Sequence, residues 1–169
     1  ILLANTYAGP NYPNVIDTIH FDPALTANGP AKILLTKGEL KITSSVNIVG
    51  LGADLLTIDA SGNDVTPLVR DGRGTRVFYV FIPGTTGAVQ ISGLTLTGAD
   101  TLSMGGAVYS RNNLKLAGVV LTGNSARDGA GVHVTSSKLE ITDSEIRGNA
   151  ARTGAGVYFA GGDARIANT

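Results

Sequence analysis

Four residues with rings occur at equivalent positions in the sequence and are its strongest candidates for binding chemistry. Each directly follows an apolar residue, so in an extended strand the apolar neighbour points to one side and the ring to the other. Exposed tyrosine rings can bind a flat apolar patch of a sugar chain or a partner while their hydroxyls form hydrogen bonds. Alternatively, rings on adjacent strands stack and hold the strands in register. The four residues are Tyr79, Tyr109, His133 and Tyr158.

Two asparagines, Asn124 and Asn149, are also candidates, because each ends a similar short motif in successive repeats of the sequence. An amide side chain can hydrogen-bond to neighbouring backbone groups and to the next asparagine of a stack. Repetition at every turn is what a structural ladder requires and what a unique binding site does not. We therefore interpret these two residues as a structural asparagine ladder.

Acidic and basic residues gather in a glycine-rich segment between positions 59 and 76. Some polysaccharide lyases combine acidic Ca²⁺ ligands with a basic proton acceptor. However, the segment 59–64 does not match a calcium-binding EF-hand loop, and neighbouring acids and bases in a turn commonly neutralise one another in solvent. We expect no catalytic residue, no metal site and no cofactor. The charged residues are Asp59, Asp64, Arg70, Asp71, Arg73 and Arg76.

Other arrangements of catalytic side chains have little support. Glycoside hydrolysis needs two carboxylates that face each other, whereas Glu140 and Glu145 stand alone at their positions in the pattern. His20 and His133 are too far apart in the sequence to indicate a zinc site.

A sequence repeat positions these side chains. Between positions 105 and 169 one sequence pattern occurs two and a half times. Val108, Val132 and Val157 occupy the same position in successive copies. In a repeat of this length, about 25 residues, no unit buries its own apolar face, and stacking of the units does so instead. Further apolar residues align with the same spacing, namely Leu116 with Ile141 and Ile166, and Leu121 with Ile146.

Each repeat contains three short runs in which apolar residues alternate with polar ones, which is typical of strands. Gly, Ser, Asn and Asp separate the runs and permit tight bends. We predict an all-β parallel β-helix with three strands per coil and about six coils. The expected divisions of this single domain 1–169 are a cap segment at 1–14, longer irregular coils at 15–104 and regular coils at 105–169.

The first half of the chain is less regular. The segment 1–9 could form a short capping helix that ends at Gly9, because Pro10 and Pro13 prevent its continuation. We expect one apolar column to divide this half into longer coils, whose additional residues lie in loops. Its members would be Ile19, Ile48, Phe78 and Val108.

The repeat motifs resemble a known family. GGAV at 105–108 and GAGV at 129–132 and 154–157, with LTGN at 121–124 and IRGN at 146–149, are similar to the repeats of the polymorphic outer-membrane protein family. The first half of the chain also resembles the amino-terminal region of large secreted bacterial β-helix proteins. These resemblances imply a right-handed coil, as parallel crossovers generally have. They further imply display on a bacterial surface, commonly with an adhesive role.

Composition excludes several classes of partner. The chain has 13 basic and 13 acidic residues, and its basic residues are scattered, so a nucleic-acid partner is not expected. It contains no cysteine, and no run approaches the roughly 18 apolar residues of a membrane span. The last residues stop partway through a coil, from which we expect either further coils of the same chain or an end-to-end copy.

These observations together predict an extracellular or cell-surface structural or adhesive protein that has no catalytic activity. It could form filaments through stacked coils, and its partners would be its own coils, a polysaccharide or a host-cell ligand. One alternative is a carbohydrate-active β-helix enzyme, which a cleft with nonrepeating acids and bases would favour. Another is a carbohydrate-binding module that uses the ring ladder.

Overall fold

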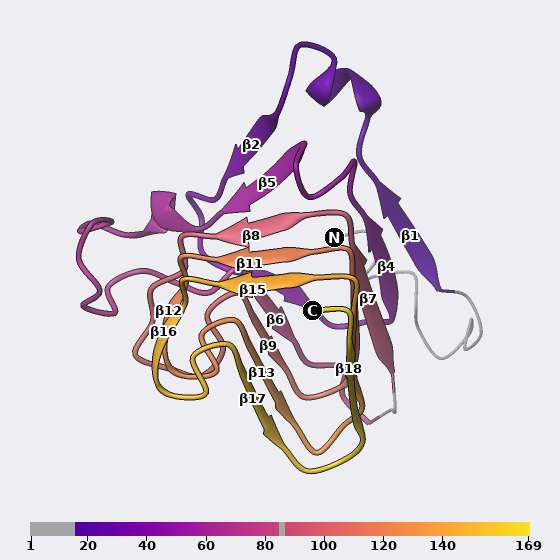
Figure 1. Ribbon diagram of the computed structural model, residues 1–169, viewed down its shortest axis with the longest axis vertical. Coiled ribbons are helices and arrows are strands. Elements are labelled where there is room, and N and C mark those ends of the chain that lie inside the picture. The colour runs from indigo at the N-terminus through magenta and orange to yellow at the C-terminus, as the bar shows by residue number, and fades with distance from the viewer. Residues whose placement is uncertain (1–15, 85–86) are drawn as a thin grey trace.

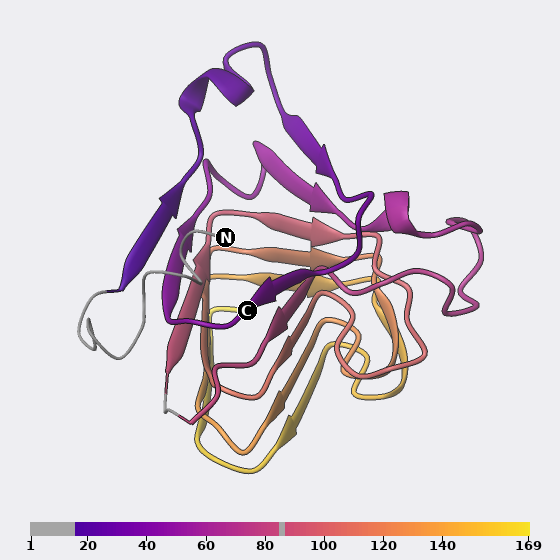
Figure 2. The same cartoon turned by 180° about the vertical axis from the view of Figure 1, so that it is seen from behind.

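The chain folds into a parallel β-solenoid, as the sequence predicts. The computed structural model describes residues 16–84 and 87–169, so the predicted helix at 1–9 lies outside the described residues. Strands follow one another around the coil and pair in parallel with their counterparts in the next coil, about six coils in all (Figures 1 and 2). Within the described residues, the only helical elements are the 3₁₀ turns η1 (Pro23–Thr26) and η2 (Ser61–Asn63).

Three sheets form the sides of the solenoid. The first contains β1 (Asp17–His20), β4 (Val46–Val49), β7 (Ala88–Ser92), β10 (Asn113–Ala117), β14 (Leu139–Thr142) and β18 (Ala164–Ala167). The second contains β2 (Ala31–Leu34), β5 (Leu56–Asp59), β8 (Thr95–Thr97), β11 (Val120–Thr122) and β15 (Glu145–Arg147). The third contains β3 (Leu40–Ile42), β6 (Phe78–Val80), β9 (Val108–Ser110), β13 (Val132–Thr135) and β17 (Val157–Ala160).

A short fourth ladder adds a side that the prediction of three strands per coil lacks. β12 (Ser125–Asp128) pairs in parallel with β16 (Ala150–Thr153). Isolated bridges from Asp100 to Ser125 and from Met104 to Asp128 continue this ladder into the preceding coil. The connection between the second and third sheets is therefore ordered by strand pairing in the later coils.

The core lies between the three sheets and consists of apolar columns. Alternation along each strand points every second side chain inward, and the parallel register then stacks like on like. One column is fully buried over four successive coils, and burial of such a side chain contributes roughly 1.5–3 kcal/mol. Its members are Ile48, Ile91, Leu116 and Ile141.

The predicted register of the regular coils is confirmed. Val132 pairs with both Val108 and Val157, and Ile141 pairs with both Leu116 and Ile166. Leu121 likewise pairs with Ile146. Residues one repeat apart in the sequence are therefore paired on adjacent parallel strands.

The predicted register of the first half is wrong at one step. Ile19 pairs with Ile48 as expected, but Ile48 continues to Ile91, while Phe78 lies in the third sheet between Leu40 and Val108. The coil from Ile48 to Ile91 is therefore longer than predicted. Its length comes chiefly from residues 60–77, which leave the solenoid between β5 and β6 and project from its body (Figure 1). We call residues 60–77 the excursion.

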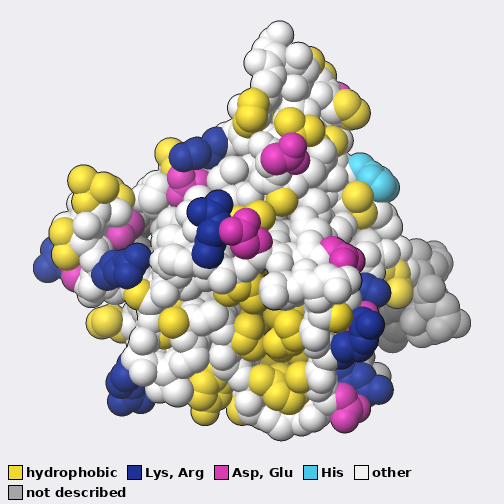
Figure 3. Space-filling model, viewed as in Figure 1, with side chains coloured by type: hydrophobic (Ala, Val, Ile, Leu, Met, Phe, Trp, Pro, Cys, Tyr) yellow, Lys and Arg dark blue, Asp and Glu magenta, His cyan; other side chains and the backbone are white. Residues whose placement is uncertain are grey.

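The last coil leaves part of its apolar side chains accessible. Val157 and Phe159 are half-buried and Ile166 is 51% exposed, whereas Val132 and Val134 one coil earlier are fully buried. Figure 3 shows apolar surface in the area between β15 and β17. In the part of the chain that the structure describes, no helix has the length and apolar character needed to cross a membrane.

Candidate functional site

The four predicted ring residues form one continuous column on the third sheet. Tyr79 stacks on Tyr109 with ring centroids 5.5 Å apart, and His133 stacks on Tyr158 at 4.6 Å. Between these pairs, Tyr109 meets His133 edge to face at 5.3 Å. The parallel register of β6, β9, β13 and β17 produces this arrangement, because it pairs the four residues directly. We call these residues the ring column.

Two arginines and a phenylalanine extend the ring column. Phe81 stacks on Tyr79 with centroids 6.5 Å apart. The Arg76 guanidinium lies 5.5 Å from the centroids of both Tyr79 and Tyr109, and Arg111 lies 4.7 Å from that of Phe81. Such cation–π contacts stabilise a ring but also cover its face. The two contacts of Arg76 cannot be predicted from the repeat pattern, because Arg76 belongs to the excursion, which does not repeat.

The expectation that the whole ring column is exposed is wrong at His133. Only 2% of His133 is exposed, and the three tyrosines are half-buried. His133 lies between the rings of Tyr109 and Tyr158, which cover it on both sides. Gly129 has a φ of +67°, and a Cβ added there would lie 2.8 Å from the Cβ of His133. The chain can approach the ring residue so closely only with glycine at that position.

His133 is held as a neutral imidazole. Its Nδ1 lies 3.3 Å from the carbonyl oxygen of Asp128, which can only accept, so Nδ1 carries the proton in this contact. Burial lowers the pKa of His133 below its ordinary value, although the hydrogen bond to Asp128 acts in the opposite direction. The ring column therefore holds a buried titratable group that is neutral at physiological pH.

The predicted asparagine ladder is present and fully bonded. Asn124 is completely buried; its Nδ2 donates to the Leu96 carbonyl and to Oδ1 of Asn149, at 3.1 and 3.0 Å. Its Oδ1 accepts the backbone N–H of Ala99 at 3.2 Å. Asn149 repeats the pattern one coil later with a bond from Nδ2 to the Leu121 carbonyl. These contacts support the structural interpretation of both asparagines.

The structure disperses the charged residues that the sequence groups between 59 and 76. Asp59 pairs with Lys32 at 2.9 Å. Burial opposes ionisation of Asp59, but hydrogen bonds from Lys32 and Ser61 outweigh it and hold the pKa of Asp59 below its ordinary value. Arg76 pairs with Glu39 at 2.8 Å. These residues therefore stabilise separate parts of the fold.

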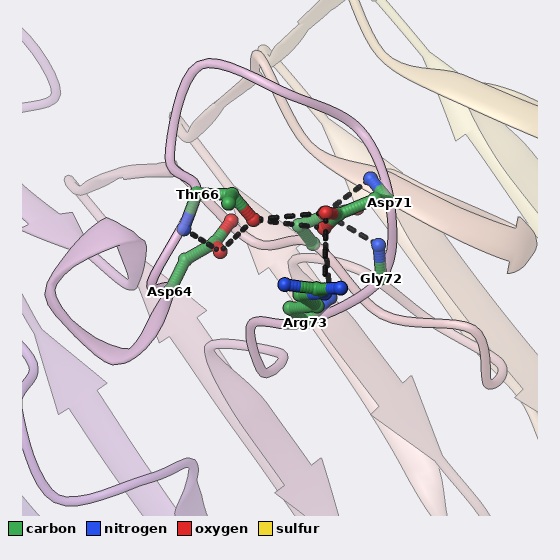
Figure 4. A network of polar contacts seen from close by, with 6 residues as sticks. Asp64, Thr66, Asp71, Gly72 and Arg73 are labelled. Atoms are coloured by element: carbon green, nitrogen blue, oxygen red, sulfur yellow. Dashed lines mark hydrogen bonds and ion pairs between the residues drawn. The ribbon is translucent and has the colours of Figure 1, made fainter.

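Three carboxylates nevertheless come together at the base of the excursion. Asp64, Asp71 and Asp100 each offer an oxygen atom, and these atoms lie within 4.8 Å of one another. We call these three residues the carboxylate cluster. Figure 4 shows the side chains of Asp64, Thr66 and Asp71 converging, with Arg73 beside Asp71. An all-oxygen group of this kind is the donor set that hard divalent cations prefer.

Asp100 was not among the predicted charged residues because it lies outside the segment 59–76 that groups the others. An antiparallel bridge between Arg73 and Thr101 brings the excursion back against the next coil. One signal was available in the sequence. Asp100 stands in register with Ser125 and Ala150, so it places an acid in a column that otherwise holds small side chains.

A shallow groove of about 570 Å³ runs over the outer face of the first sheet. A polar column in strand register lines it, comprising Asn47, Gln90, Lys115, Glu140 and Arg165. Glu140 lies 3.5 Å from Lys115 and 3.1 Å from Arg165. Asp163 also lines the groove, where its carboxylate lies 4.0 Å from Lys138.

Comparison of the chain with protein-family models, with curated proteins and with solved structures finds no match. The chemistry of the described residues therefore provides the basis for a functional assignment. The groove can form hydrogen bonds through amides and charged groups. The rings of the ring column stack on one another and stabilise adjacent strands, and the carboxylate cluster concentrates negative charge.

Proposed function

We propose that this chain is a structural and adhesive β-solenoid of a cell surface or extracellular matrix. The observation that carries the proposal is the polar column of the groove. Parallel strands repeat about every 4.8 Å, which spaces Asn47, Gln90 and Lys115 as a regular row of donors and acceptors. A polysaccharide offers hydroxyl groups along its length that such a row can bind. The resemblance of the repeats to adhesive surface proteins supports the same assignment.

The groove replaces the ring column as the candidate binding surface. The ring faces are engaged with one another and with Arg76, whereas Lys115 and Arg165 keep 43% and 66% of their side chains exposed. Hydrogen bonds to charged groups contribute about 1.5–3 kcal/mol each, so a few suffice for modest affinity per repeat. Self-association through stacked coils belongs to the same proposal and is measurable by sedimentation velocity.

A glycan array is the first test of this proposal. We expect the purified chain to bind acidic or neutral polysaccharides, and the double variant Gln90→Ala with Lys115→Ala to lose at least about 10-fold in affinity, because two polar contacts disappear. Arg147→Ala is the matched control, since Arg147 is exposed on the second sheet and pairs with Glu145. Binding that the groove variant retains in full would contradict this location.

The same samples test the enzymatic alternative. The specific observation that favours it is the meeting of Asp71 with Arg73 in a segment that does not repeat, with Nε and Oδ2 3.4 Å apart. We expect no shortening of any bound polysaccharide during long incubation. Release of short products, abolished by Asp71→Asn, would replace the adhesive assignment with a carbohydrate-active enzyme.

A further inference from the structure

The carboxylate cluster contains more negative charge than its neighbours neutralise. Arg73 approaches Asp71, but 64% of the Arg73 side chain is exposed, so solvent screens this pair. Asp100 by contrast is only 5% exposed. Like charges held this close raise the free energy of the folded state unless a proton or a cation joins them.

Thr66 shows the same excess of acceptors. Its hydroxyl lies 3.2 Å from Oδ1 of Asp64 and 3.0 Å from each carboxylate oxygen of Asp71 (Figure 4). A hydroxyl has one hydrogen to donate. It therefore cannot satisfy both carboxylates, and the contacts without its proton bring oxygen lone pairs together. A cation among these oxygens would turn the repulsive contacts into ligand contacts.

Asp100 provides an independent sign that a ligand is required. Its Oδ2 accepts the backbone N–H groups of Asp71 and Gly72 at 3.0 and 2.7 Å. Its Oδ1 is buried without any hydrogen-bond partner among the described residues. A buried acceptor left in this state costs about 1–3 kcal/mol, and more when charged. The two backbone bonds fix the carboxylate in place, so it cannot turn toward solvent.

We propose that Asp64, Asp71 and Asp100 bind a divalent cation, Ca²⁺, at the base of the excursion. Ca²⁺ takes oxygen ligands at about 2.3–2.6 Å, so two ligands on opposite sides of the ion are separated by about 4.6–5.2 Å. The oxygen atoms of the carboxylate cluster lie within 4.8 Å of one another, so one ion of this kind can contact all three. Ca²⁺ also accepts a flexible arrangement of its ligands, whereas Mg²⁺ takes ligands at about 2.0–2.1 Å and demands near-ideal octahedral geometry.

Binding would fasten the excursion to the solenoid. Asp64 and Asp71 belong to the excursion, whereas Asp100 belongs to the connection between β8 and β9. The tip between the two excursion ligands carries Val65 and Leu68, which are 77% and 99% exposed. The cation would therefore determine how firmly these apolar side chains are presented. This inference does not depend on polysaccharide binding by the groove.

Thermal unfolding of the full chain, with Ca²⁺ or with a chelator, tests the proposal. At Ca²⁺ about 100 times the dissociation constant, we expect the midpoint to rise by about 5–10 °C. Limited trypsin digestion provides a second readout, because Arg70 and Arg73 lie in the excursion and their side chains are accessible. Ca²⁺ should slow cleavage at these residues at least about 10-fold.

Variants distinguish the site from general salt effects. Asp100→Asn and Asp64→Asn should each abolish both responses to Ca²⁺. Asp163→Asn is the matched control, because the Asp163 side chain is 85% exposed in the last coil, and it should respond like the unmodified chain. The proposal is overturned if the unmodified chain does not respond to Ca²⁺, or if both cluster variants still respond. Should either variant fail to fold, the other and the trypsin assay decide.

Discussion

The asparagine ladder lies beside the column that contains Asp100 of the carboxylate cluster, and the two differ in how their buried polar atoms are hydrogen-bonded. Asn124 is in register with Asn149, and one position later Asp100 is in register with Ser125 and Ala150. The amide brings donors and acceptors together, so each asparagine satisfies the next one and adjacent backbone groups. An ionised carboxylate has acceptors only and cannot be stacked in this way.

The difference explains why one column repeats and the other does not. A self-satisfying side chain stabilises every coil in which it occurs, as the bond between Asn124 and Asn149 illustrates. A carboxylate needs donors from outside its column, and the excursion provides them to Asp100 from the backbone of Asp71 and Gly72. Asp100, the residue that departs from the repeat, therefore lies where the nonrepeating excursion is bound to the solenoid.

Removal of the ladder amide should produce the largest change. Asn124→Ala deletes the partner of the Ala99 N–H, the Leu96 carbonyl and Asn149 in a buried position. We expect a loss of about 3 kcal/mol in the free energy of unfolding, since each buried group left unpaired costs roughly 1–3 kcal/mol. Urea unfolding measures this change. The control Asn47→Ala, on the outer face of the first sheet, should cost less than about 1 kcal/mol.

The equivalent change in the carboxylate cluster should have the opposite sign. With chelator present, Asp100→Asn removes one buried charge and can still accept the Asp71 and Gly72 N–H groups through its amide oxygen. We expect the free energy of unfolding to rise by about 1 kcal/mol. Urea unfolding in chelator is again the measurement. A loss as large as that of Asn124→Ala would show that the two columns do not differ as described.

His133 extends the comparison to a third kind of buried polar group, one that is neutral like the asparagines but can become charged. Because its pKa is lowered in the folded chain, the unfolded chain takes up a proton first as pH falls below the ordinary value of 6.5. The stability contributed by the neutral imidazole is fully present above this ordinary pKa and decreases on acidification through the window down to the folded pKa. Denaturant midpoints measured across this range should show the decrease.

His133→Phe should remove this part of the pH dependence, since phenylalanine does not titrate. The matched control His20→Gln should retain it, because His20 lies on the exposed side of β1. An unchanged slope in His133→Phe would assign the effect to another group. The contribution of Asp59 falls in a separate window, below its ordinary pKa of 3.8.

The smallest effect is expected for the exposed charges of the groove. Lys115→Ala removes an ion pair with Glu140 in which both side chains are well exposed. Such pairs contribute about 0–1 kcal/mol, and Arg165 still neutralises Glu140. Urea unfolding should therefore show little change in stability even where polysaccharide affinity decreases. A large loss of stability would mean that the polar column holds the sheet together.

The regular half of the fold could be predicted from sequence because each coil there repeats the geometry of the one before it. The constant repeat spacing was enough to identify the partners of Val132 and Ile141. The same reasoning was wrong between Ile48 and Phe78, because the alternation of apolar residues does not show which of the three sheets a strand joins.

The candidate sites were predictable to a similar extent. Periodicity predicted the ring column but not the burial of His133, which depends on how the flanking rings of Tyr109 and Tyr158 pack against it. Proximity in the sequence grouped Asp64 with Asp71, but the third carboxylate, Asp100, is brought to them by the bridge from Arg73 to Thr101, a contact between segments of different coils. Long-range contacts that do not repeat leave no period in the sequence.

The connection between the second and third sheets has a consequence for how such molecules acquire new parts. Successive coils join these sheets with residues 35–39, 60–77, 98–107, 123–131 and 148–156. Since each coil pairs only with its neighbours, the longest of these connections leaves the flanking ladders intact. This corner of the solenoid is therefore a natural grafting position. A foreign peptide or an epitope inserted at Leu68, which is 99% exposed in the longest connection and belongs to no strand, would be carried by the same scaffold while the strand ladders stay paired.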